Sequence, residues 1–100
     1  MDFQATIIVA AAVTKPDALN AISRVLDSPV QGAAAHPFVA LPHGGRVLVE
    51  VPKFGEAPPL AIDVFDPRGQ EQAQAAADAL LLALAEATGW PIHHLLGSVQ

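Results

Sequence analysis

The stretch DPRGQEQAQAAADALLLALAEATG, from Asp66 to Gly89, has the pattern of one long amphipathic helix. Asp66 followed by Pro67 is a typical helix start, because the carboxylate can cap the first turn and proline lacks an N–H that this turn leaves unpaired. Gly89, followed by a Trp-Pro pair, is a typical stop. The sequence therefore predicts a helix from about Pro67 to Thr88.

One side of this helix should lie on a sheet, because small and apolar residues recur there at about 100° per residue. These residues are Ala73, Ala77, Leu80, Leu84 and Ala87. Leu82 breaks the pattern, since it projects between Asp78 and Glu86 on the side that should face water. Two interpretations remain open, namely an isolated exposed leucine or a contact with another chain.

The chain before this helix predicts a strand and a second helix. Odd positions from Phe3 to Val13 are all apolar and even positions are mixed, which is typical of a central strand. Thr14 can then cap a helix that begins at Lys15-Pro16, with Asp17 as its capping-box partner. The sequence Asp27-Ser28-Pro29 should end this helix.

Several short elements are expected in the remaining chain. The turn Pro42-His43-Gly44-Gly45 should join two strands, because paired glycines supply the positive backbone angles of a tight hairpin. The expected strands are 38–41, 46–51 and 60–65, the expected loops are 30–37 and 52–59, and 90–96 is either a short last strand or an extended arm.

The resulting order is β-α-β-β-β-α with a possible short C-terminal strand. Two helices that each bury one face, combined with a mainly antiparallel sheet, predict an α+β two-layer sandwich with both helices on one face. This outline is close to a ferredoxin-like arrangement, which by itself implies no function. Residues 1–96 are expected to form a single domain and residues 97–100 a frayed tail.

Composition and charge exclude some function classes. The net charge of −5, with only 5 Lys plus Arg, argues against nucleic acid as a partner and favours a basic protein. The absence of cysteine excludes disulfides and thiolate zinc sites. Charged residues make up 15% of the chain, which suggests that part of the surface meets another chain, although the base composition of the source genome explains this equally well.

No membrane segment or signal peptide is expected. The apolar run near the N-terminus is too short for a bilayer, which needs about 20 residues. Asp2 precedes this run and no Lys or Arg occurs before Lys15, whereas a signal peptide begins with basic residues. We therefore expect a cytoplasmic protein.

The sheet face opposite the helices is the main candidate interaction surface. Ile8, Leu48 and Phe65 would form an apolar centre if the strand registers bring them together, and Arg46 could form a charge pair beside them. The alternative is a sheet face with scattered apolar residues. The candidate surface comprises Thr6, Ile8, Arg46, Leu48, Glu50, Asp63, Phe65 and, on the long helix, Leu82, with His43 as a candidate loop contact.

The sequence predicts no catalytic, cofactor-binding or metal-binding residues. His93 and His94 are adjacent, so their side chains diverge, whereas a metal site needs three or four converging ligands. Asp63 and Asp66 could form a carboxylate pair, but Asp66 is already explained as a helix cap and Asp63 as a solvent-facing strand residue. An enzymatic activity is therefore not the favoured interpretation.

Three functions remain, in order of preference. The first is a small acidic, non-enzymatic protein-binding module, such as a toxin-neutralising (immunity-type) inhibitor of a basic partner. The second is a homodimeric ferredoxin-like enzyme or small-molecule binder that uses the open sheet face. The third is a structural subunit of a larger assembly. A homodimer is expected from the low charge and the uncovered sheet face.

Overall fold

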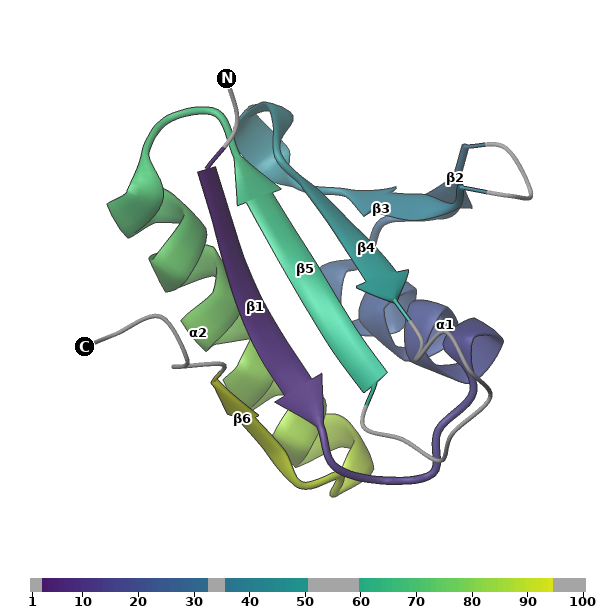
Figure 1. Ribbon diagram of the computed structural model, residues 1–100. Helices are drawn as coiled ribbons and strands as arrows, with labels where there is room; N and C mark the ends of the chain where they lie inside the picture. The colour runs from purple at the N-terminus through teal and green to yellow at the C-terminus, as the bar shows by residue number, and fades with distance from the viewer. Residues whose placement is uncertain (1–2, 33–35, 51–59, 95–100) are drawn as a thin grey trace.

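The computed structural model describes residues 3–32, 36–50 and 60–94 (Figure 1). The elements in chain order are β1 (Phe3–Val9), α1 (Lys15–Leu26), β2 (Val30–Gln31), β3 (Phe38–Ala40), the 3-10 helix η1 (Pro42–Gly44), β4 (Arg46–Glu50), β5 (Leu60–Asp66), α2 (Gln70–Thr88) and β6 (Ile92–His94). The predicted α+β class is confirmed, and the possible C-terminal strand is present as β6.

The strands form one antiparallel sheet in the order β2-β3-β4-β5-β1-β6. Both helices lie on the same side of this sheet, with α2 behind β1 and β5 and with α1 behind β3 and β4 (Figure 1). Both helices therefore cover one face of the sheet, as predicted, and no element within residues 3–32, 36–50 and 60–94 covers the other, which is called the uncovered face below. The likeness to a ferredoxin-like arrangement stays a topological prediction.

The core lies between the helices and the covered face of the sheet. Alternate residues of β1 and β5 point into it, and Ala73 and Ala77 of α2 are fully buried against the strands. The small alanine side chains let the backbone of α2 approach the sheet closely. The largest fully buried apolar side chains are Ile7, Val9, Ile22, Val39, Val47, Val49, Leu60, Ile62, Val64 and Leu84.

Helix α1 begins and ends where the sequence predicts. The Thr14 hydroxyl accepts a hydrogen bond from the Asp17 N–H at 3.2 Å, which satisfies one of the free donors of the first turn. At the other end, Asp27 adopts the left-handed conformation with φ 52°, and its N–H donates back to the Arg24 carbonyl. Asp27 therefore closes the helix in the conformation that glycine more often takes.

The predicted start of α2 is wrong. The helix begins at Gln70 with Gly69 at its N-cap, and Asp66 is instead the last residue of β5, paired with Phe3. The Asp66 carboxylate, only 1% exposed, accepts hydrogen bonds from the Arg68 N–H at 2.8 Å and from Arg68 Nη2 at 2.7 Å. This carboxylate therefore orders the turn before α2 and does not cap the helix. The predicted end is confirmed: Gly89 is the C-cap with φ 77°, and its N–H donates to the Ala85 carbonyl.

The ion pair between Arg68 and Asp66 raises the pKa of Arg68 above its ordinary value, chiefly through their hydrogen bond. A raised pKa in the folded state gives stability that is present below the ordinary pKa and lost only as the pH rises through the folded value. Arg68 therefore adds no pH dependence to stability near neutrality.

Two loops also differ from the predictions. Val30–Gln31, expected in a loop, forms β2, which pairs with β3. In the turn before β4 only Gly44 has a positive φ, 88°, whereas Gly45 has φ −80°. Glycine is needed at position 45 for space, since an added Cβ would lie 2.6 Å from the Phe65 carbonyl oxygen. The expected loop 52–59 and tail 97–100 lie outside the described residues.

We expect Asp66→Asn to lower the free energy of unfolding by about 1–2 kcal/mol, because a neutral amide cannot accept the charge-assisted bonds that Arg68 Nε donates to Oδ1 and Arg68 Nη2 donates to Oδ2. Urea denaturation would measure this change. Asp27→Asn is the control, because asparagine tolerates the left-handed conformation and the substitution should change stability little. Equal stability of the two variants would contradict the role given to Asp66.

Candidate functional site

The uncovered sheet face contains the residues that the strand alternation predicts there. They alternate with buried core residues along β1, β4 and β5, and all except the exposed Glu50 are half-buried. They are Thr6, Ile8, Arg46, Leu48, Glu50, Asp63 and Phe65. The side chain of His43 lies outside the described residues.

The strand registers determine which of these side chains meet. Asp63 lies opposite Thr6 on one side and opposite Leu48 on the other. Phe65 lies opposite Arg46, and Ile8 lies opposite Ala61. Ile8, Leu48 and Phe65 therefore occupy three different cross-strand rows. Directly opposed pairs are the closest contacts on a sheet face, and these three apolar residues make none with one another.

The centre of the face is a polar network. The Thr6 hydroxyl donates to Asp63 Oδ1 at 2.7 Å, and Gln4 Nε2 donates to the same oxygen at 3.0 Å. Beside this network, the Arg46 guanidinium lies 5.0 Å from the centroid of the Phe65 ring, a cation–π contact. On this face, Asp63 is therefore hydrogen-bonded to its neighbours, and the Phe65 ring contacts Arg46.

A second uncovered surface lies on the outer side of α2. We call it the acidic face, and it comprises Glu71, Ala75, Asp78, Leu82 and Glu86, all exposed. These residues project away from the buried side of the helix. Leu82 is 69% exposed, and within the described part of the chain only Val30 is another large apolar side chain classed as exposed.

The charge on this helix has one sign. From Gln70 to Thr88 the sequence contains three carboxylates and no Lys or Arg. Glu86 lies near the negative end of the helix dipole, where a carboxylate is unfavourable. Glu86 has no ion-pair partner among the residues that the structure describes. Its position is therefore not explained by the stability of the helix.

Asp78 has a structural contact as well as an exposed position. Its Oδ1 atom lies 2.9 Å from His94 Nε2 and accepts a hydrogen bond from Gln74 Nε2 at 3.1 Å. The contact with His94 joins the edge strand β6 to α2. Part of the acidic face is thereby held in a fixed geometry.

The carboxylate pair and the histidine pair considered from the sequence do not converge in the structure. Asp63 lies on the uncovered face of β5 and Asp66 on the buried face, so they do not form a carboxylate pair. His93 and His94 point to opposite sides of β6. No group of three potential metal ligands occurs within residues 3–32, 36–50 and 60–94.

None of the helices described here has the length and hydropathy needed to cross a bilayer.

The sequence identified Leu82 as a candidate contact but did not show that Glu71 and Ala75 lie on the same exposed side of the helix. The three carboxylates were visible in the sequence, but the predicted helix began at Pro67 and so included Arg68; only the observed start at Gln70 leaves α2 without a basic side chain. No protein-family model and no curated protein matches this chain. A function must therefore be argued from the chemistry of its own surfaces.

Proposed function

We propose that this protein is a non-enzymatic binding module that holds a basic segment of another protein against the acidic face of α2. The observation that supports this function is Leu82, a large apolar side chain that is 69% exposed among carboxylates. An apolar anchor surrounded by charges is the usual anatomy of a protein interface. An inhibitor that occludes a basic partner, such as a toxin-neutralising protein of the cytoplasm, would act in this way.

The charge of the acidic face argues for a basic partner. Two copies of α2 packed on each other would bring Asp78 and Glu86 close to like charges, which repel more strongly as water is excluded. A segment with Lys or Arg on either side of an apolar strip would instead pair with these carboxylates and cover Leu82. Opposite charges would also speed the encounter, since the whole chain has a net charge of −5.

The acidic face is favoured over the open sheet face for this role. On the sheet, Asp63 accepts from Gln4 and Thr6, and Arg46 covers Phe65, so a partner would have to replace existing contacts. On α2, Leu82 exposes most of its surface to water, and covering it would be favourable by itself.

A synthetic amphipathic peptide helix tests the proposal, with leucines on one side and lysines flanking them. We expect fluorescence anisotropy to detect binding that weakens as salt is added. Leu82→Ser should weaken this binding by about ten-fold, because the buried leucine surface is lost. The matched control is Leu48→Ser on the open sheet face, which should leave the affinity unchanged.

Two outcomes would contradict this function. One is a loss of affinity in Leu48→Ser as large as that in Leu82→Ser. The other is equal binding of a peptide in which glutamates replace the lysines, because opposite charge would then play no part.

A homodimer through the open sheet face is compatible with this proposal, because the acidic face belongs to the helix layer and would stay accessible in such a dimer. Such a dimer would also suit the alternative function, a small-molecule binder with a site between two sheets. Light scattering on Phe65→Glu and Leu82→Glu distinguishes the surfaces. A dimer that only Phe65→Glu dissociates would assign self-association to the sheet and leave α2 for the partner.

A further inference from the structure

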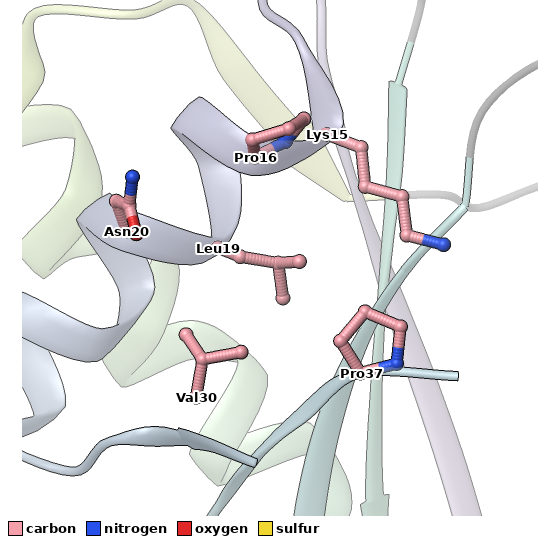
Figure 2. A pocket seen from close by; sticks show the side chains of 6 residues that line it. All are labelled: Lys15, Pro16, Leu19, Asn20, Val30 and Pro37. Atoms are coloured by element: carbon pink, nitrogen blue, oxygen red, sulfur yellow. The ribbon is translucent and has the colours of Figure 1, made fainter. Parts of the chain in front are cut away.

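A groove of about 310 Å³ lies between the start of α1 on one side and Val30 of β2 and Pro37, next to β3, on the other (Figure 2). This volume is at the lower end of the range for small-molecule sites. It contains no residue of α2 and is therefore distinct from the acidic face. Of the residues that the structure describes, Lys15, Pro16, Leu19, Asn20, Val30 and Pro37 line it.

The walls of the groove are mainly apolar. The side chains of Leu19, Val30 and Pro37 extend toward a common space, with Pro16 above them (Figure 2). Val30 is 38% exposed although it belongs to a strand, so an apolar ligand in the groove would remove part of its surface from water. The space suits a short hydrocarbon chain or a single ring.

The polar groups of the groove lie at its edges. The Lys15 side chain extends toward Pro37 and its ammonium ends above that ring, whereas the Asn20 amide lies on the opposite side (Figure 2). Lys15 is also the first residue of α1, where the helix dipole adds positive potential. The exposed Asp17 in the same turn opposes this potential, but it does not line the groove, and its N–H is bonded to Thr14.

We propose that this groove binds a small carboxylate with a short apolar body, such as a six-carbon fatty acid. The hydrocarbon covers Leu19 and Val30, and the carboxylate forms an ion pair with the Lys15 ammonium. The proposal does not depend on the binding of a protein partner by α2.

Titration of the ¹⁵N-labelled protein with hexanoate, followed by NMR, tests this site. We expect saturable shift changes at the amides of Lys15, Leu19, Asn20 and Val30. Hexanol has the same apolar chain without the charge, and it should bind about five-fold more weakly because it cannot form the ion pair. Acetate, which has the charge without the chain, should cause no saturable change at Val30.

Two variants of α1 distinguish the ion pair from a general effect of charge. Lys15→Gln should make hexanoate and hexanol bind equally. Arg24→Gln removes the same charge near the other end of the helix and should preserve the preference for hexanoate. The spectra of both variants report directly whether they are folded.

The proposal is overturned if hexanoate causes no saturable change at the groove amides of the unaltered protein. It is also overturned if hexanol binds as tightly as hexanoate, or if Arg24→Gln removes the preference as completely as Lys15→Gln. A weaker binding of both ligands to Val30→Ala, with the preference retained, would support the apolar part of the site.

Discussion

Ala77→Leu is expected to destabilise the protein by about 2–3 kcal/mol, which is a lowering of the melting temperature by roughly 10 °C. Ala77 is fully buried where α2 lies on the sheet, and the larger side chain would push the helix away from β1 and β5. Separation of these layers would expose apolar surface and loosen the packing of Ile7 and Ile62. Thermal and urea denaturation would measure the loss.

Ala79→Leu is the matched control for this change. Ala79 is exposed on the same helix, and alanine and leucine have similar helix propensities. The free energy of unfolding of this variant should lie within about 0.5 kcal/mol of that of the unaltered protein. If both variants were equally stable, α2 would not approach the sheet as closely as the burial of Ala77 indicates.

Glu86→Lys is expected to have opposite effects on stability and on binding. A cation near the C-terminal end of α2 interacts favourably with the helix dipole, so stability should rise by about 0.3–1 kcal/mol. Binding of the basic peptide should fall by about 20-fold at low salt, because an attractive contact next to Leu82 becomes a repulsive one. Denaturation and anisotropy on the same sample would measure the two effects.

Glu50→Lys provides the control, because Glu50 is also exposed but lies at the end of β4 on the sheet. This variant has the same net charge as Glu86→Lys and should retain most of the affinity. Similar losses in both variants would mean that only the net charge of the protein matters. A loss of stability in Glu86→Lys would show that the carboxylate serves the fold.

Local patterns predicted which of the main elements are helices and which are strands, because apolar residues recur every three to four positions in a helix and every second position in a strand. They did not predict where α2 begins. Asp66-Pro67 satisfies the local rules for a helix start, but pairing with Phe3 extends β5 through Asp66 and Arg68 binds the carboxylate. Phe3 is distant in sequence, so this competition is not visible in the local pattern.

The same distinction applies to the candidate surfaces. Alternation was sufficient to assign Thr6, Asp63 and Phe65 to one sheet face, and helical periodicity was sufficient to place Leu82 in water. The registers were not predictable, and they decide that Asp63 meets Thr6 and that Arg46 covers Phe65. The groove could not be predicted either, because Lys15 and Val30 come to line the same space only after α1 and β2 have packed.

The position of β1 in the sheet affects how the chain folds during synthesis. β1 is made before the other strands described here, yet its two neighbours are β5 and β6, and the closest of its pairs in sequence joins Val9 to Leu60. Until β5 leaves the ribosome, the apolar side chains of β1 have no native strand partner and are open to aggregation or to chaperones. Folding must therefore close a loop that contains α1, β3 and β4, which slows it relative to chains with local contacts.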